Sequence, residues 1–283
     1  MAQVTIIDEG AESIVSLKIS DDGSRTITKT RKPGGKTHYL FEAFAYTAVK
    51  NLGARVPTVI SASEDELIMT ALDGETLDDQ TALYTDKSIF DAIAKDLTLN
   101  GGVTFEGFGQ AVATGKTYQG EYASWLAFLS DTHTKLLEST IFSKEQKTFL
   151  SHEWDTLVPY ISLDKGALVH GDFALSTVFV RQNVYIGTID YGDAFIGDPL
   201  IDLAYFRFKE LTKLYGFGLY DMLATSYAAY RNIKRSDIDK SVLFYMIYWA
   251  IERSHTDNLE DAIIAKFIEK TDVLIELLIE QAQ

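Results

Sequence analysis

The sequence contains no cysteine and only four prolines among its 283 residues. The absence of cysteine excludes disulfides, thiolate catalysis and cysteine-based zinc sites. It is also compatible with a cytoplasmic location. The scarcity of proline accords with a chain that has no Pro-rich linker, no internal repeat and no low-complexity tract.

Long hydrophobic runs are absent as well. The most apolar stretch, VLFYMIYWAI at 242–251, has about half of the roughly 20 residues that a membrane-spanning helix needs. The N-terminal MAQVTIIDEG lacks the basic segment and apolar core of a secretory signal. We therefore expect a soluble, cytoplasmic protein with no membrane partner.

Basic residues are few, with 26 Lys and Arg against 41 Asp and Glu, and the formal net charge is −15. Such a charge repels nucleic-acid phosphates, so we expect no nucleic-acid partner. Two explanations of the acidity stay open. It keeps the protein soluble, or it attracts a cationic substrate or metal ions.

The pattern of the chain changes near residue 75. Before that point QVTIIDEG, SIVSLKIS and RTITKT predict strands, and TVISAS and ELIMTAL predict two more. Between these groups THYLFEAFAYTAVKNLG has apolar residues at helical spacing, with Gly53 at its end as a C-cap. The first lobe, residues 1–72, is therefore predicted as β-β-β-α-β-β.

The second lobe, residues 73–283, is predicted to be mostly helical because its apolar residues follow a 3.6-residue period. Ser143 and Gln146 predict a capping box at the start of one helix. A single hairpin, TVFVRQNVYIGTID, interrupts the helices at a tight turn over residues 181–183. The sequence thus predicts an α+β fold with a small β-rich lobe and a larger helical lobe.

Two aspartates flank this hairpin. Asp172 lies in His170-Gly171-Asp172 before it, and Asp190 follows its second strand in TIDYGD. Because the hairpin folds the chain back on itself, both carboxylates can face one cleft. Phosphoryl transfer needs such a pair, one carboxylate for the acceptor hydroxyl and one for a metal ion that bridges the phosphates.

The segment LVHGDFALSTVFV…GTIDYGDAFIGDPLIDLAYF resembles the core of the aminoglycoside phosphotransferase family. That family has HGD, four residues, Asn, an apolar hairpin, ID with an aromatic residue, GDP and DLA. EGFGQ at 106–110, followed by YASWLAFL, further resembles hygromycin-type members. The matching residues are His170, Gly171, Asp172, Ile189, Asp190, Tyr191, Gly197, Asp198, Pro199, Asp202, Leu203 and Ala204.

The resemblance implies a protein-kinase-like bilobal fold and an ATP-dependent phosphotransferase, with ATP or GTP and Mg²⁺ as cofactors. Asp172 would be the catalytic carboxylate, His170 would brace its loop, and Asp190 would bind magnesium. Asp198 and Asp202 are instead predicted to fix the backbone at the start of a helix.

The first lobe would supply the nucleotide site. Lys29 has the position of the lysine that contacts the α/β-phosphates, and Glu42 is the candidate for its ion-pair partner. Lys18 and Lys32 are competing lysines nearby. DEGAESIV at 8–15 lies where a phosphate-covering turn belongs, although it has a single glycine.

The strand LIMTALDGETL is expected to contact adenine through Met69, Thr70 and Leu72. The same letters would also suit an ordinary buried strand that leads into a loop. The sequence alone therefore leaves both interpretations of these three residues open.

Thr177 departs from the family pattern, which has Asn at this position. Threonine can bind magnesium through its hydroxyl, but its reach is shorter than that of asparagine. Three outcomes are open: a modified two-metal site, a one-metal enzyme, or a nucleotide binder with little transfer activity. We favour retained catalysis because the other parts of the phosphoryl-transfer site are present.

The acceptor is expected to be a small molecule, with an aminoglycoside-like cation as the first candidate. Relatives also phosphorylate choline, homoserine and sugars, and the fold does not determine the substrate. An atypical protein kinase and a pseudokinase are the alternatives, and the chain is expected to be a monomer or dimer. Candidate substrate residues, which also suit a solvated helix face, are Glu252, Asp257, Glu260 and Asp261.

A Thr177→Asn variant tests whether the threonine supports catalysis. We expect the wild-type chain to bind ATP with magnesium and to transfer phosphate, and we expect Thr177→Asn to retain that transfer. Assays of ATP binding and ADP release across an aminoglycoside panel measure both steps. Wild type that binds ATP without transfer, beside a Thr177→Asn variant that gains activity, would identify a pseudokinase.

Overall fold

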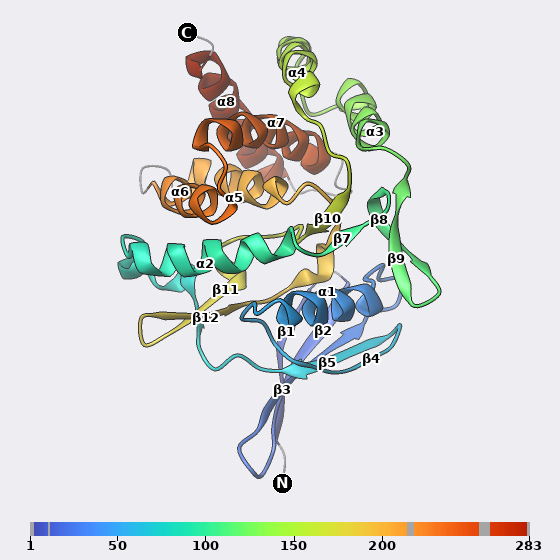
Figure 1. Cartoon of the computed structure of the whole chain (residues 1–283), viewed down its shortest axis with the longest axis vertical. Helices are drawn as coiled ribbons and strands as arrows, with labels where there is room; N and C mark the ends of the chain where they lie inside the picture. The colour runs from blue at the N-terminus through green and yellow to red at the C-terminus, as the bar shows by residue number, and fades with distance from the viewer. Residues whose placement is uncertain (1–2, 11, 214–217, 255–260, 282–283) are drawn as a thin grey trace.

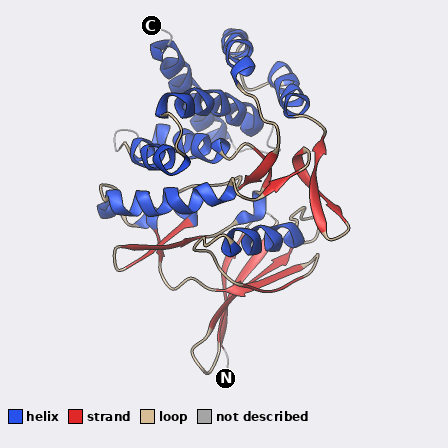
Figure 2. Cartoon of the chain, in the orientation of Figure 1, coloured by secondary structure: helices blue, strands red, loops and turns tan. Residues whose placement is uncertain are grey.

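The computed structural model describes residues 3–10, 12–213, 218–254 and 261–281. Its strand-rich lobe lies at the bottom of Figure 1 and its larger, mostly helical lobe at the top. Figure 2 shows this segregation of strands and helices directly. The predicted α+β fold with two unequal lobes is confirmed, whereas the boundary at residue 72 stays a prediction.

The small lobe is built on one antiparallel sheet with the strand order β1-β2-β3-β5-β4. Its helix α1 (Tyr39–Asn51) follows the third strand, so the predicted order β-β-β-α-β-β is confirmed. Lys29 lies in the central strand, opposite Val15 on one side and Leu67 on the other. The strands are β1 (Gln3–Glu9), β2 (Ser13–Ile19), β3 (Arg25–Arg31), β4 (Val59–Ala62) and β5 (Glu66–Thr70).

Helix α1 turns one face to the sheet and to the larger lobe. Tyr39, Ala45, Tyr46 and Val49 on this face are completely buried, whereas Leu40, which the sequence pattern placed in the apolar stripe, is exposed. Glu42 lies among them with only 1% of its surface exposed. A buried carboxylate on an apolar helix face needs a cationic partner, and its partner comes from β3.

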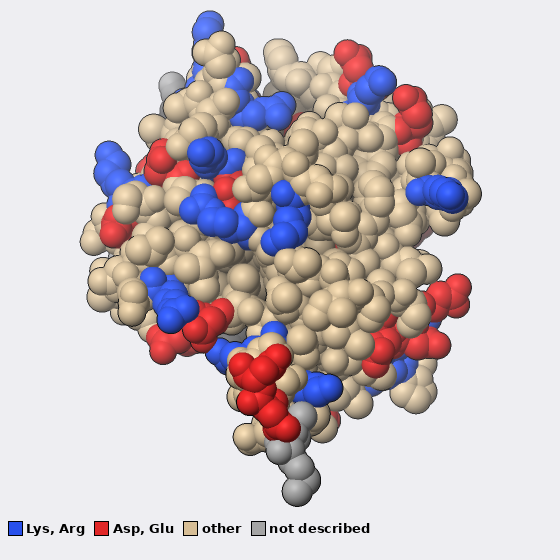
Figure 3. Space-filling view, turned by 60° about the horizontal axis from the view of Figure 1, so that its bottom comes forward, with Lys and Arg blue, Asp and Glu red and all other residues tan. Residues whose placement is uncertain are grey.

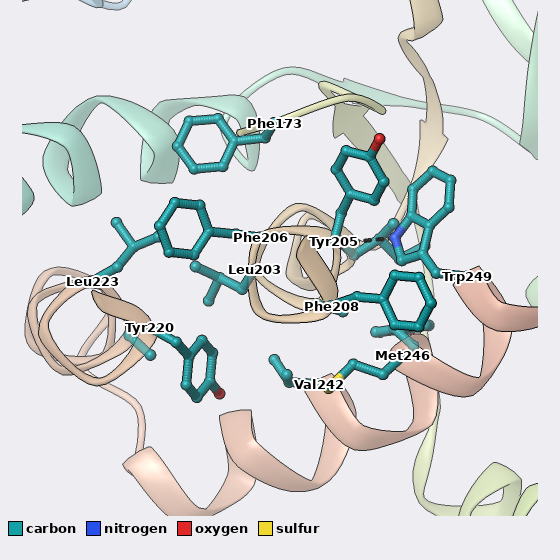
Figure 4. Packing of buried hydrophobic residues seen from close by; sticks show 14 of the residues in the cluster. Phe173, Leu203, Tyr205, Phe206, Phe208, Tyr220, Leu223, Val242, Met246 and Trp249 are labelled. Carbon is teal, nitrogen blue, oxygen red and sulfur yellow. Dashed lines mark hydrogen bonds between the residues drawn. The ribbon is translucent and has the colours of Figure 1, made fainter. Parts of the chain in front are cut away.

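The large lobe is organised around α7, whose middle is buried on all sides. Figure 4 shows side chains of α5, α6 and α7 packed together, with the indole of Trp249 donating a hydrogen bond to the Ile201 carbonyl. The predicted capping box of Ser143 and Gln146 is confirmed at the start of α4. The helices are α2 (Lys87–Asn100), α3 (Trp125–Glu138), α4 (Lys144–Leu157), α5 (Leu200–Lys213), α6 (Leu219–Arg231), α7 (Arg235–Ser254) and α8 (Asp261–Gln281).

The predicted hairpin is also present. Gln182 and Asn183 form its two-residue turn with φ values of 50° and 62°, the left-handed pair that matches the twist of the flanking strands. A short 3₁₀ turn that contains Thr177 precedes the hairpin, and another that begins at Tyr191 follows Asp190. Strands β11 (Val178–Arg181) and β12 (Val184–Thr188) form the hairpin, and β6 (Glu75–Thr76) pairs with β11 as the third strand of the sheet. The 3₁₀ turns in the described part of the chain are Leu77–Asp79, Thr81–Leu83, Val158–Tyr160, Leu175–Thr177 and Tyr191–Asp193.

The prediction of a single hairpin in the large lobe is wrong, because a second sheet lies there with the order β7-β10-β13-β8-β9. Two of its strands form a hairpin in which most residues are exposed or half-buried. The sequences of β8 and β9 therefore lack the alternation of apolar and polar residues by which a strand is predicted. The strands are β7 (Thr104–Phe105), β8 (Phe108–Thr114), β9 (Thr117–Tyr122), β10 (Gly166–Val169) and β13 (Phe195–Gly197).

Charged side chains of both signs occur on the face of the molecule drawn in Figure 3. On the face shown in Figure 3, acidic and basic side chains are interspersed and no large patch of one sign forms. Among the described residues, no helix is long and apolar enough to cross a membrane. Because both signs of charge are mixed on the face drawn in Figure 3, the net charge of −15 does not mark a binding surface there.

An ion pair links the segment after α1 to helix α2 of the large lobe. Asp96, which is 7% exposed, accepts hydrogen bonds from the Arg55 backbone nitrogen at 2.8 Å and from its guanidinium at 2.9 Å. The guanidinium also lies over the ring of Tyr185, 4.5 Å from its centroid. One carboxylate thus fixes both the backbone and the side chain of Arg55.

We expect Asp96→Ala to lower the free energy of unfolding by about 2–3 kcal/mol, because several charge-assisted hydrogen bonds are lost together. Urea denaturation followed by circular dichroism measures the change. Asp65→Ala is the matched control, since Asp65 is largely exposed and lies 3.9 Å from Arg31; its effect should stay within about 0.5 kcal/mol. Equal losses in the two variants would contradict the assignment.

Candidate active site

Three segments distant in sequence meet at Lys29. Its Nζ lies 2.5 Å from Glu42 Oε1 on α1 and 2.6 Å from Asp190 Oδ1, which follows β12. The side chains of Lys29 and Glu42 are 12% and 1% exposed, whereas that of Asp190 is 46% exposed. The lysine therefore bridges a buried carboxylate in one lobe and an accessible carboxylate in the other.

The charges of this cluster support one another. Burial alone would lower the pKa of Lys29, but Glu42 and Asp190 together hold it well above its ordinary value. Burial also opposes ionisation of Asp190, yet Lys29 keeps the pKa of this carboxyl below its ordinary value. Burial raises the pKa of Glu42, whose Oε2 has no hydrogen-bond partner among the described residues.

The backbone at Asp190 adopts a left-handed conformation with a φ of 72°, which is uncommon outside glycine. The backbone nitrogen of Asp190 donates a hydrogen bond to the buried hydroxyl of Tyr46 at 2.6 Å, and this bond helps to hold the left-handed conformation. Gly192 covers the cluster, since a Cβ there would lie 3.2 Å from Asp190 Oδ1. Strain of this kind concentrates at functional sites, where the surrounding structure maintains it.

The HGD loop is held by a carboxylate of helix α5. Asp202, which is fully buried, accepts hydrogen bonds from the backbone nitrogens of His170 at 2.9 Å and Gly171 at 3.0 Å. The ring of His170 donates from Nε2 to the Ile189 carbonyl at 2.8 Å, which leaves Nδ1 facing the Asp172 nitrogen at 3.4 Å. The bond from His170 to Ile189 ties the loop of Asp172 to the segment that follows β12 and leads to Asp190.

This arrangement corrects one prediction. Asp202 does not fix the start of its own helix, because both of its oxygens accept hydrogen bonds from the HGD loop. Asp198 does behave as predicted, accepting a hydrogen bond from the Leu200 nitrogen at 3.0 Å at the start of α5. The motif spacing could not distinguish the two roles, because they depend on which backbone groups lie within reach.

Asp172 is 31% exposed and has neighbours that the sequence did not identify. The Arg253 guanidinium lies 3.7 Å from its Oδ1 and donates a hydrogen bond to the Tyr205 hydroxyl at 2.8 Å. Asp193 also lies near Asp172. Burial is the main cause that raises the pKa of Asp193, and the negative charge of Asp172 raises it further. Asp193 stands close to the ID motif in sequence, but no pattern pointed to Arg253 or Tyr205.

An apolar cavity of about 270 Å³ lies between the two lobes, under the small sheet. Val15 and Ile27 line it from the sheet, and Phe179 and Ile189 line it from the hairpin. Met69, Thr70 and Leu72, the residues expected to contact adenine, all line this cavity, together with Lys29 and Asp190. A flat apolar ring fits between two such walls, with a phosphate chain directed toward the lysine.

A second cavity of about 500 Å³, called here the polar cavity, lies on the other side of the site. Gly171, Asp193 and Arg253 line it from the large lobe, and Glu12 and Lys36 line it from the small lobe. Asp8 of β1 lines the apolar cavity and Glu12, just before β2, lines the polar one. Both residues belong to the segment 8–15 that the sequence proposed as the phosphate-covering turn, a role that stays a prediction.

Of the predicted substrate residues, Glu252 lines the polar cavity. Its carboxylate accepts hydrogen bonds from Lys135 at 3.0 Å and Thr132 at 3.2 Å. Asp257 and Glu260 lie outside the described residues, and Asp261 begins α8 with a side chain that is not described.

Thr177 has a hydroxyl that is already bonded within its own turn. This hydroxyl donates to the Ala174 carbonyl at 2.9 Å and accepts from the Ala174 nitrogen at 3.3 Å, and the residue is 5% exposed. It closes the 3₁₀ turn that leads into β11. To bind a metal ion it would have to give up the bond to Ala174.

The competing lysines lie elsewhere. Lys18 is exposed on β2, and Lys32 donates to the Gly10 carbonyl at 2.7 Å. No cluster of three or more metal-ligating side chains occurs among the residues that the structure describes. Magnesium commonly uses one or two carboxylates together with substrate phosphates, and the accessible Asp190 fits that requirement.

Comparison with known proteins gives a family and a fold. A model of the phosphotransferase enzyme family matches residues 3–235, whereas a search of curated protein sequences finds no match. A thermostable mutant of aminoglycoside phosphotransferase APH(4)-Ia, solved with AMP-PNP and hygromycin B, has a TM-score of 0.71 and 18% identity over 97% of this chain and 93% of its own.

Two other solved structures are similar. Amicoumacin kinase hAmiN, in complex with AMP-PNP, Ca²⁺ and Ami, has a TM-score of 0.63 and 14% identity, covering 97% of this chain and 88% of its own. ADP-bound aminoglycoside phosphotransferase APH(2'')-Ib has a TM-score of 0.57 and 14% identity, covering 96% and 92%. These likenesses establish the shared fold, so the predicted protein-kinase-like fold is confirmed.

Gly171 tests the packing of the HGD loop. Its φ is +86°, and an added Cβ would lie 2.0 Å from the Asp193 carbonyl oxygen. Gly115 has a similar φ of +67° with nothing within 4 Å, so Gly115→Ala isolates the backbone strain at about 1–2 kcal/mol.

We expect Gly171→Ala to lower the free energy of unfolding by about 4 kcal/mol or more, because the clash adds to the strain. Thermal and urea unfolding of both variants measure the difference. A Gly171→Ala variant as stable as Gly115→Ala would show that the loop can move away from Asp193.

Proposed function

Because the chain belongs to the phosphotransferase enzyme family, we propose that it transfers the γ-phosphate of ATP to a hydroxyl group of a small molecule. The observation that carries the proposal is the position of Lys29. Its ammonium contacts carboxylates of both lobes and lies at the wall of the apolar cavity. A phosphate chain bound there would meet a fixed positive charge at its centre.

On the nucleotide side, the adenine ring would occupy the apolar cavity against Met69 and Leu72. Lys29 would contact the phosphates, with Glu42 holding the ammonium in place. Asp190 would hold Mg²⁺, which when bound neutralises charge on the β- and γ-phosphates. GTP is the alternative nucleotide.

On the acceptor side, Asp172 would orient the hydroxyl and accept its proton as the oxygen attacks the γ-phosphorus. The new P–O bond forms as the bond to the β-phosphate oxygen breaks, and ADP leaves. His170 and Asp202 act on the position of Asp172, because their hydrogen bonds fix the HGD loop. Positioning of this kind accounts for much of the catalysis in phosphoryl transfer.

The acceptor would occupy the polar cavity, and a compound with amino groups is the first candidate. Glu12 and Asp193 give this cavity carboxylates that can bind ammonium groups. The similar structure of APH(4)-Ia contains hygromycin B beside a nucleotide. Both observations support the aminoglycoside-like acceptor that the sequence suggested.

A pseudokinase is the alternative, and the hydrogen-bonded hydroxyl of Thr177 favours it. Without a second protein ligand, the metal site would depend on Asp190 and the phosphates alone. Such a site still binds magnesium with nucleotide, since magnesium keeps several waters in many phosphate complexes. The two alternatives therefore differ in transfer and not in nucleotide binding.

We expect Asp172→Asn to lower kcat about 100- to 10,000-fold while nucleotide binding is retained, because only the contact with the acceptor proton is lost. Asp190→Ala should instead abolish the dependence of ATP binding on magnesium. Calorimetry with Mg-ATP and assays of ADP release separate the two effects. Asp164→Asn, an exposed aspartate outside both cavities, is the control, and an Asp172→Asn variant with wild-type turnover would refute the assignment.

A further inference from the structure

Arg253 stands on two aromatic rings beside Asp172. Its guanidinium carbon lies 5.2 Å from the ring centroid of Tyr205 and 5.4 Å from that of Trp249. Both aromatic residues are buried, at 2% and 7% exposure, and Figure 4 shows them side by side. Aromatic contacts and the hydrogen bond to the Tyr205 hydroxyl therefore hold this guanidinium in one place.

Most donors of this guanidinium remain available to a ligand. Among the described residues its hydrogen bond is to the Tyr205 hydroxyl, and Asp172 at 3.7 Å is beyond hydrogen-bond distance. Arginine carries several N–H donors in a planar fork that matches carboxylate and phosphate oxygens. The side chain is 38% exposed and lines the polar cavity.

The polar cavity has mixed charge, although the whole chain is acidic. Arg253 and Lys36 contribute positive charges to its lining, against Glu12, Asp193 and Glu252. Glu252 is already neutralised by Lys135, at 3.0 Å. The described lining is thus suited to a ligand that carries charges of both signs, with its anionic group directed at Arg253.

We propose that the acceptor carries an oxyanion, which is either a carboxylate or a phosphate ester. Arg253 binds this oxyanion, while Asp172 accepts a hydrogen bond from the hydroxyl group that is phosphorylated. Amino groups of the same acceptor would lie toward Asp193 and Glu12. This inference rests on the proposed phosphotransferase function and specifies its substrate class. The acceptor proposed above, a hydroxylated compound with amino groups, is thereby specified as one that also carries an acidic group.

A series of hexoses that differ in charge tests the proposal. Glucose, glucosamine, glucuronate, 2-amino-2-deoxygluconate and glucose 6-phosphate would be measured by calorimetry and ligand-observed NMR in the presence of Mg-ADP. We expect the three acid-bearing compounds to bind more tightly than glucose and glucosamine. Comparison of glucuronate with glucose 6-phosphate distinguishes a carboxylate from a phosphate ester.

Arg253→Gln should weaken the binding of the preferred acid about 10- to 100-fold, the effect of losing hydrogen bonds to a charged group. Glucose should bind as before, and glucosamine more tightly, because a repelling charge is removed. Arg207→Gln is the matched control, since Arg207 also stands over a tyrosine, Tyr220, but outside the polar cavity. Arg253→Gln should retain Mg-ADP binding, which shows that it is folded.

Two results would overturn the proposal: no acid-bearing compound binds better than glucose, or the preference persists in Arg253→Gln. For a compound that is phosphorylated, Arg253→Gln should raise KM by a larger factor than it lowers kcat. A fall in kcat alone would place Arg253 at the transferred phosphate and would also overturn the proposal. Acid-bearing compounds that bind through Arg253 but release no ADP would refute the phosphotransferase function and leave the oxyanion site standing.

Discussion

The contact of one lysine with two carboxylates joins the lobes at the point where chemistry is expected. Lys29 comes from the small sheet, Glu42 from α1 and Asp190 from the end of the hairpin. A buried ion pair adds little net stability, because the loss of hydration offsets the attraction. The ion pairs instead fix the geometry of the site, because the Lys29 ammonium can contact both carboxylates only when the three segments are correctly placed relative to one another. Within the described part of the chain, Oε2 of Glu42 has no hydrogen-bond partner, and the backbone of Asp190 is strained; both are consistent with a site kept for function.

A second network holds the HGD loop independently of that lysine. Asp202 lies on α5, in the core of the large lobe, and binds the loop through two backbone nitrogens. The Asn100 amide on α2 lies 3.5 Å from the same carboxylate, and the Tyr191 hydroxyl donates to Asn100 at 3.0 Å. Burial raises the pKa of Asp202, while the bonds from the loop act in the opposite direction. The loop of Asp172 is therefore fixed by the large lobe, and Asp190 contacts both lobes.

The sequence predicted the local elements well where a strong pattern was present. The small lobe, the hairpin turn at Gln182 and Asn183, and the capping box of Ser143 follow from short-range rules that act within a few residues. The second sheet of the large lobe was missed because its hairpin, β8 and β9, lacks apolar alternation and its other strands are short and come from distant segments. The role of Asp202 was misassigned for the same reason, since its partners lie on another element.

The sequence by itself determined the two-lobed fold, the motif that carries Asp172 and Asp190, and the membership of a phosphotransferase family. Periodicity and motif spacing are properties of neighbouring residues, so they survive in a one-dimensional record. The tertiary structure alone decided that Arg253 stands beside Asp172. Contacts across long sequence separations leave no local pattern, because packing of α5 and α7 creates them. The charge of the polar cavity is accordingly a property of the fold and not of the composition.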